Sequence, residues 1–434
     1  MTDMLNKTLF VFKDKFIRSK IVFILFAFFI FRLFASVPLP IVDQGALQKF
    51  FSDNQFLGMI NLFSGGGLEA LSIVMFGVMP YITASIIMQL MSFSYPKLKK
   101  MQQEEGEIGR KKIGNYSRLL SVPLAAIQAF GFLHLLNSYQ LLENFDSNVM
   151  MTSITVAVAG SIFLMWVGEL ISEFGIGNGL SLMIFAGIVS SFPGRLRQLW
   201  ENLSNDISVL PAYLGIGALF LFMIYAIVYV TEASRPVPVH NARTARAGEK
   251  AQNIQSFIPI KLNQAGVIPI IFASVLISLP QVVVSILQLG KVETWSWLQS
   301  LVDVSSNPSA NLMYSIYYGI AFFILVFFFT FFYTAVTFDP KKMAENLQKG
   351  GTFVPGVRPG EETEEFFAKV TTRVTFVGAL FLSSVAVIPF VVSGLTGNPN
   401  LAIGGTSILI VVSVGIDLIR KIDAQISVRQ YLNS

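Results

Sequence analysis

The fold of this chain is decided by Gly77-Val78-Met79-Pro80-Tyr81-Ile82-Thr83-Ala84-Ser85, which recurs as Gly266-Val267-Ile268-Pro269-Ile270-Ile271-Phe272-Ala273-Ser274. Six of the nine positions are identical, at a constant offset of 189 residues. A second pair of segments, residues 179–184 and 405–410, shares the same pattern of Gly, Ser and aliphatic residues. The two pairs predict a chain built from two homologous halves. Unrelated Gly- and Pro-rich helices are the alternative interpretation.

Each repeated stretch lies in or beside an apolar segment of membrane-spanning character. A spanning helix needs roughly 20 apolar residues. The sequence offers ten candidates, of which the fifth and the tenth are short and flanked by Gly: Ile21–Val37, Ile73–Phe93, Leu119–Ser138, Thr152–Ile171, Leu180–Phe192, Pro211–Val230, Ala265–Leu287, Met313–Phe338, Val374–Val392 and Thr406–Ile419.

The positions of the repeats predict how the two halves are oriented. They pair the second segment with the seventh and the fifth with the tenth, so each half holds five segments. Because five is odd, the halves face opposite ways across the membrane. Inverted repeats of this kind place a transport pathway at their interface. We therefore expect an all-α membrane protein with ten transmembrane helices in two inverted five-helix halves.

The basic residues predict which ends of these segments face the cytoplasm. Cytoplasmic loops of membrane proteins carry an excess of Lys and Arg. With the N-terminus inside, the inner segments hold 26 of the 31 basic residues and the outer segments hold 4, while Arg32 lies within the first span. Both termini are therefore expected in the cytoplasm.

The composition excludes several classes of function. The chain has 434 residues, is 53% hydrophobic and 13% charged, and contains no Cys and only two His. This excludes disulfides, thiol catalysis and Cys- or His-rich metal centres. No nucleotide-binding, zinc-protease or serine-hydrolase motif is present. We expect no catalytic residue, no metal and no cofactor, so any energy for transport comes from another protein.

The loops and termini complete the expected organisation. The N-terminal stretch is basic and amphipathic, and no small-residue cleavage site follows the first apolar run, so it does not resemble a cleavable signal. We expect an N-terminal helix at 1–20, a first half at 21–193, an external hinge loop at 194–210, a second half at 211–420 with polar docking loops at 231–263 and 339–373, and a cytoplasmic tail at 421–434.

Charged side chains within the spans are few. Ion-coupled transporters usually carry carboxylates or other charges in mid-membrane. Here Arg32 lies near the outer third of its span and is expected to snorkel to the surface. Glu169, Glu173 and Asp417 lie at cytoplasmic ends, and His134 is expected to be a packing residue. None of them suggests a proton relay, which weakens the alternative of an inverted-repeat secondary transporter for small solutes. A structural scaffold without a pore is a third, weaker hypothesis.

The repeated segments instead supply aliphatic side chains. Such residues usually serve helix packing. At an interface between inverted halves they can also form a hydrophobic constriction that excludes water. A constriction of this kind suits a large, varied passenger, and its expected members are Val78, Ile82, Leu180, Ile184, Ile271 and Ile410.

Several long strings spread over the chain resemble the SecY family (SecY/Sec61-alpha). The resemblance is carried by Asn61–Glu69, Pro80–Ile87, Glu169–Gly187 with its Gly175–Gly179 turn, Asn263–Pro269 and Gly351–Gly360. It implies the pore-forming subunit of a protein-translocation channel in the cell (plasma or inner) membrane, with two halves that hinge around a lateral gate. Bacterial plasma membrane and thylakoid both remain open.

The resemblance also assigns residues and partners. It places the pore ring on the six aliphatic residues above. It implies a small plug helix from about Asn61 to Ala70, with Asn61, Leu62, Phe63, Ser64, Gly65, Gly66, Gly67 and Leu68 as its core. It places docking of the SecA ATPase or the ribosome on Arg243, Arg246 and Arg358, although basic residues are sparse in the loop 231–261. Further implied partners are SecE, SecG, signal sequences, precursor polypeptides and lipids, with no nucleic acid except ribosomal RNA.

Overall fold

The protein, a computed structural model, is described at residues 14–40, 45, 47, 50–51, 61, 64–103, 105–142, 146–205, 210–241, 256–289, 312–396 and 403–433. Helices overlap all ten expected apolar segments: α2 (Lys15–Ala35), α5 (Met79–Ser94), α7 (Gly106–Ser138), α8 (Ser147–Phe174), α9 (Gly179–Asn205), α10 (Leu210–Glu232), α12 (Ile268–Leu289), α14 (Leu312–Thr337), α16 (Glu361–Thr396) and α17 (Ile403–Asn433). Within the described residues, five helical stretches are long and apolar enough to cross a membrane. The count of ten spans stays a prediction.

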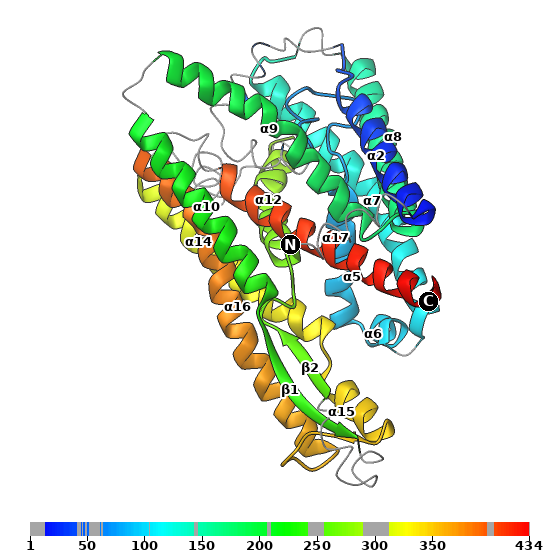
Figure 1. Ribbon diagram of the computed structural model, residues 1–434. Coiled ribbons are helices and arrows are strands. Elements are labelled where there is room, and N and C mark those ends of the chain that lie inside the picture. Colours follow the sequence, from blue (N-terminus) through cyan, green and yellow to red (C-terminus); the bar gives the residue numbers. More distant parts are fainter. Residues whose placement is uncertain are drawn as a thin grey trace.

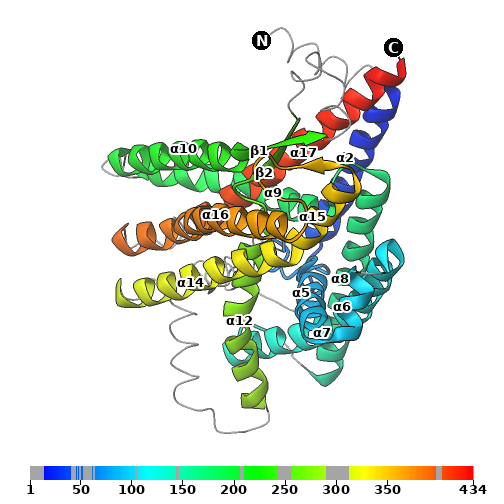
Figure 2. The ribbon, with the colours of Figure 1, turned by 90° about the horizontal axis from the view of Figure 1, so that it is seen from below.

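The helices form two groups that follow the chain order. Figure 1 shows α2, α5, α7 and α8 on one side and α10, α14 and α16 on the other. α5 packs against α7, and α7 against α8, in the first group, while α14 packs closely along α16 in the second. Contacts between the groups come from α12, which meets α5 and α7, and from α17, which meets α9. Seen from below, α12 lies between α14 and the first group (Figure 2).

The second expected span begins later than its hydropathy suggests. Residues 73–78 form turns, and helix α5 begins at Met79 with a Pro in its first turn. Gly77 has a φ of 54°, a left-handed conformation that interrupts a right-handed helix. Pro80 then starts the helix, because its fixed φ suits a first turn and its missing N–H is not needed there.

Several helices extend beyond their expected spans into neighbouring segments. The hinge loop expected at 194–210 is helical up to Asn205, because Pro193 is accommodated within α9 and Arg197 pairs with Glu201 one turn on. The cytoplasmic tail expected at 421–434 belongs to α17 as far as Asn433. The described part of the N-terminal helix, from Lys15, is continuous with α2, and its earlier residues lie outside the described part of the chain.

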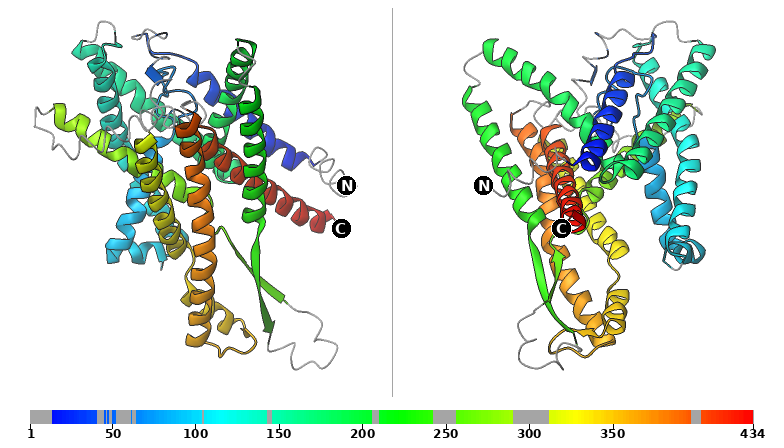
Figure 3. Two further views of the ribbon diagram at one scale, coloured as in Figure 1. Left: turned by 90° about the vertical axis from the view of Figure 1, so that its left-hand side faces the viewer. Right: turned by 45° about the vertical axis from the view of Figure 1, so that its right-hand side comes forward.

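The two polar docking loops fold together into a small sheet. Strand β1 (Ser234–Asn241) pairs with β2 (Ser256–Lys261) and, at its end, with β3 (Thr352–Phe353), so the sheet order is β2-β1-β3. Pro236 and Pro238 lie where β1 has only β2 as a neighbour, which is an edge position that tolerates Pro. The hairpin continues directly from α10 and extends from one end of the molecule beside α15 (Pro340–Lys349) (Figure 3).

Among the residues that the structure describes, the buried apolar side chains form three clusters. The largest lies between the helices and draws on both groups. A second cluster, which includes Leu47, Leu71 and Leu133, is confined to the first group. A third lies under the sheet and joins Val237 and Val354 to Phe367 of α16. The sheet is therefore anchored to a helix that runs the length of the second group.

Candidate functional site

The six aliphatic residues expected to form a ring all belong to the largest buried cluster. Val78 precedes α5, whose first turn carries Ile82; the others come from α9, α12 and α17. Four are buried and two are half-buried: Val78, Ile184, Ile271 and Ile410, then Ile82 and Leu180. Elements from both helix groups thus supply this one cluster. The closing of these residues into a ring around a pore stays a prediction.

Helix spacing aligns members of this set. Val78 and Ile82 are four residues apart, as are Leu180 and Ile184, and residues with this separation share a helix face. The N–H of Ile82 donates to the carbonyl of Val78 at 3.1 Å, which fixes the first pair in register at the helix start. Leu180 contacts the position where Gly168 would carry a Cβ, at 3.2 Å, so it lies in the seam between α8 and α9. The arrangement offers apolar surface and no ligand chemistry.

The Gly-rich segment (residues 61–70) lies next to the ring cluster. Its described residues from Ser64 to Ala70 form turns, so the expected short helix is wrong for them, and Leu62 and Phe63 lie outside the described residues. Gly65 and Gly66 have φ values of 73° and 83°, which a right-handed helix cannot contain. Ser64, Gly65, Gly67 and Leu68 are nevertheless buried.

Arg32 of α2 turns toward this segment. One guanidinium nitrogen, Nη1, lies 3.4 Å from the carbonyl oxygen of Gly65 and 3.4 Å from the hydroxyl of Ser190 in α9. Arg32 is exposed and also makes these two contacts, so its snorkelling to the membrane surface stays a prediction. Its signal in the sequence was a permanent charge inside an apolar helix, a placement that usually marks function.

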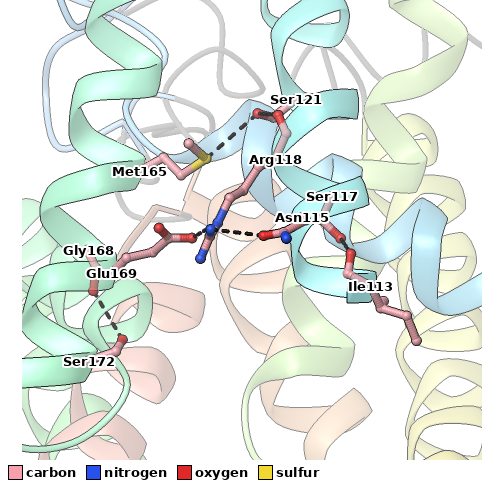
Figure 4. A network of polar contacts seen from close by, with 9 residues as sticks. All are labelled: Ile113, Asn115, Ser117, Arg118, Ser121, Met165, Gly168, Glu169 and Ser172. Atoms are coloured by element: carbon pink, nitrogen blue, oxygen red, sulfur yellow. Dashed lines mark hydrogen bonds and ion pairs between the residues drawn. The ribbon is translucent and has the colours of Figure 1, made fainter. Parts of the chain in front are cut away.

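A polar network joins α7 to α8 (Figure 4). Arg118 of α7 forms an ion pair with Glu169 of α8 and also donates to Asn115. Ser121 reaches the sulfur of Met165 across the same two helices at 3.8 Å. Glu169 thus serves as a link between helices. The other charged or titratable residues considered from the sequence also have local roles, since Asp417 pairs with Lys421 and His134 stacks on Phe130.

Arg358, which we expected to be a docking residue, lies on a hydrogen-bonded turn with its guanidinium 3.8 Å from the Glu362 carboxylate. Its side chain is 88% exposed, while its own N–H donates to the Glu362 carboxylate and its carbonyl accepts from Thr363 at 2.7 Å. Gly356 and Gly360, with φ of 81° and 110°, make the turns on either side. The guanidinium of Arg358 is therefore presented outward from a fixed backbone. Arg243 and Arg246 lie outside the described residues.

No group of three or more His, Asp or Glu side chains that suits a metal ion occurs in the described part of the chain. The arrangement supplies a large apolar surface and an exposed cation, and we assign no chemical step to it.

Curated relatives match almost the whole chain. It is 37% identical to the protein translocase subunit SecY of Staphylococcus epidermidis over 429 residues, with 97% of both chains covered. It is 38% identical to that of Pseudomonas aeruginosa over 419 residues, covering 95% of this chain and 92% of the relative. The subunit of Aquifex aeolicus is 37% identical over 437 residues, with 98% and 97% covered.

Solved structures share the fold. A structure described as a protein conducting channel aligns with a TM-score of 0.65 at 19% identity, covering 92% of this chain and 90% of that one. Sec61 in a canine ribosome–channel complex from the endoplasmic reticulum gives the same score, identity and coverage. The model of the SecY family matches residues 72–419. With this match and full-length relatives above 30% identity, the chain belongs to the SecY family.

Proposed function

We propose that this chain is the pore-forming subunit of a protein translocase and passes unfolded polypeptides across a membrane. It also releases hydrophobic segments sideways into the bilayer. The observation that carries the proposal is the largest buried cluster, which draws on both helix groups and includes or borders all six expected ring residues. An apolar constriction seals by excluding water and places no demand on the chemistry of the passing chain. The family membership favours this function over transport of a small solute.

The proposed setting is the cell membrane, with both termini in the cytoplasm. The distribution of Lys and Arg supports this orientation. In this orientation the sheet of β1, β2 and β3, with the nearby Arg358, faces the cytoplasm. The halves 21–193 and 211–420 would move relative to each other about the α9–α10 connection to admit a signal sequence.

We place the driving partner, SecA or a ribosome, at the cytoplasmic sheet and at Arg358. A fixed, exposed guanidinium suits recognition of carboxylates or phosphates. A partner shifts the closed–open equilibrium only through its preference for one state. SecE and SecG are proposed as companion subunits against the exposed apolar faces of the helix groups. α10 provides one such face, since Leu221 and Tyr225 are 70% and 68% exposed.

A crosslinking experiment tests the proposed pathway. A photoreactive amino acid is placed at position 184, and a radiolabelled precursor is arrested in mid-translocation. The precursor is expected to crosslink at this position. A probe at position 221, on the exposed face of α10, is the matched control and is expected to remain unlinked. Crosslinking only at position 221 would contradict the proposed pathway.

A further inference from the structure

Arg32 joins three parts of the molecule that are far apart in the sequence. Its Nη1 atom lies 3.4 Å from the carbonyl oxygen of Gly65 and 3.4 Å from Oγ of Ser190. The Ser190 hydroxyl itself donates to the Gly187 carbonyl of its own helix at 2.8 Å, so its lone pairs are left to accept from the guanidinium. The first-span helix, the Gly-rich segment and α9 therefore meet at one cation.

The Gly-rich segment fits this place closely. A Cβ on Gly65 would overlap the ring of Phe31 and lie 3.0 Å from Cα of Gly187. Phe31 is 4% exposed, so its ring has little room to move. The backbone at Gly65 is thus inserted between α2 and α9, where only Gly fits, and its carbonyl is directed to Arg32.

Internal hydrogen bonds join the described residues of the segment to one another. The Asn61 side chain accepts from the N–H of Glu69 at 3.0 Å and donates to its carboxylate at 2.7 Å. The Ser64 hydroxyl donates to the Asn61 carbonyl and accepts from the N–H of Leu68. The N–H of Gly66 closes the turn on the Asn61 carbonyl at 2.9 Å. A contact that fixes Gly65 therefore fixes the whole segment.

Arg32 is exposed, and its charge strengthens the hydrogen bond to the Gly65 carbonyl. A guanidinium on an apolar helix is costly unless its donors find acceptors, and hydrogen bonds from charged donors are stronger than neutral ones. If the Gly-rich segment left this position, Arg32 would lose the Gly65 carbonyl as an acceptor. The seated position of the segment is favoured by that difference.

We infer that Arg32, together with Ser190, is a latch that holds the Gly-rich segment in its seated position. The inference rests on the proposed function and takes this segment to be the plug expected from the sequence, which would leave the pathway when a polypeptide enters. The strength of the latch then sets how readily the resting channel opens, without Arg32 touching the passenger.

A labelling experiment tests the latch. The chain contains no Cys, so a single Leu68→Cys provides a unique thiol on a side chain that is 0% exposed in the seated state. Leu68→Cys protein in vesicles is treated with a membrane-impermeant maleimide, with and without Arg32→Met. We expect Arg32→Met to raise the labelling rate severalfold, because the lost hydrogen bond has a charged donor but belongs to an exposed side chain. An unchanged labelling rate would overturn the latch.

Variants of α9 test the other side of the contact. Ser190→Ala is expected to raise the labelling rate by a smaller factor than Arg32→Met. Its matched control is Ser191→Ala, because the Ser191 hydroxyl is also half-buried and donates to a carbonyl of its own helix, that of Ile188. Equal labelling in both Ser variants would contradict the Ser190 contact. Arg32→Lys retains the charge but not the planar guanidinium, and is expected to give an intermediate rate.

The outcome is separable from the proposed function. If a precursor crosslinks at position 184 but Arg32→Met leaves the labelling rate unchanged, the proposed function is supported and the latch is refuted. If labelling follows Arg32 but no precursor crosslinks, the contact is structural and the proposed function fails. The elution volume and thermal midpoint of Arg32→Met protein show whether its faster labelling comes from a folded molecule, and faster labelling from unfolded protein alone would count against the latch.

Discussion

Glycines determine how closely the helices of this protein approach one another. A Cβ on Gly179 would overlap the backbone carbonyl of Gly168, so α8 and α9 meet backbone to backbone at the turn between them. Likewise, a Cβ on Gly160 of α8 would overlap the carbonyl of Ile73. Small residues at such contacts let membrane helices associate where lipid removes the hydrophobic drive.

Gly179→Ala should therefore destabilise the protein. The added methyl forces α8 and α9 apart, and overpacking of this kind costs about 1–3 kcal/mol. The thermal midpoint in detergent is expected to fall. Gly194→Ala, in the same helix but with no atom within 4 Å of the added Cβ, is the control. It should leave the midpoint unchanged or raise it, because Ala favours a helix over Gly. Equal midpoints for the two variants would contradict the close approach.

Ile82→Ser with Ile184→Ser should make the resting channel leak ions. Hydroxyls in the constriction hold water and so weaken a seal that depends on dewetting. Conductance of planar bilayers containing the double variant is expected to rise severalfold. Leu221→Ser, on the exposed face of α10, should leave the conductance unchanged. An unaltered conductance in the double variant would remove these two residues from the ring.

Arg358→Glu should stop secretion while the protein still inserts into the membrane. The substitution reverses the charge at an exposed, fixed tip and repels an acidic partner. In vitro translocation of a precursor is the measurement. Lys369→Glu, the same charge change on an exposed residue of α16, is expected to translocate normally. Normal translocation by the Arg358 variant would count against docking at that residue.

At the scale of elements, the three-stranded sheet joins the loops 231–263 and 339–373 into one structural unit. β1 carries the first loop and β3 the second, and His240 stacks on Phe353 where they pair, with ring centroids 6.2 Å apart. Beneath them Phe367 of α16 is fully buried among Val237, Val354 and their neighbours. A displacement of either loop is therefore expected to displace α16.

Phe367→Ala should loosen this structural unit. Removing a buried Phe side chain costs about 3–5 kcal/mol, which is expected to raise hydrogen exchange in β1 and β2 while α7 and α8 stay protected. Phe257→Ala, whose ring is 51% exposed on β2, is the control and should exchange as the parent does. Unchanged exchange in the Phe367 variant would show that the sheet does not depend on this anchor.

At the scale of the whole molecule, α17 connects regions that the chain order separates. Arg420 donates to the Glu232 carboxylate and to the Thr231 carbonyl at the end of α10, both at 3.0 Å. Further along α17, the guanidinium of Arg429 lies 4.3 Å from the ring centroid of Phe16 in α2. The last helix thus ties the start of the hairpin to the first helix of the chain (Figure 2).

Arg420→Ala should lower the thermal midpoint by breaking the tie to α10. Hydrogen bonds to charged groups contribute about 1.5–3 kcal/mol, reduced toward about 1 kcal/mol here because the pair is partly exposed. Lys369→Ala removes an i,i+4 ion pair on an exposed helix face and should change the midpoint little. Equal shifts for the two variants would contradict a special role for Arg420.

The sequence by itself determined the helices, their approximate limits and the family. Hydropathy located a helix at each of the ten expected segments, because each is a long apolar stretch, and the repeated Gly-Val-x-Pro segments lie at the starts of α5 and α12. Hydropathy did not predict the start of α5 or the end of α9. These limits depend on the backbone conformation at Gly77 and Pro193, which composition does not reveal.

Only the tertiary structure decided which residues meet across the chain. β1 and β3 are about a hundred residues apart, and the hydrogen bonds that join them leave no local pattern in Pro-rich loops. Arg32 could be recognised as an unusual charge, yet its partners Gly65 and Ser190 are a backbone carbonyl and a common hydroxyl. Their pairing follows from packing of distant segments, which periodicity along one helix cannot encode.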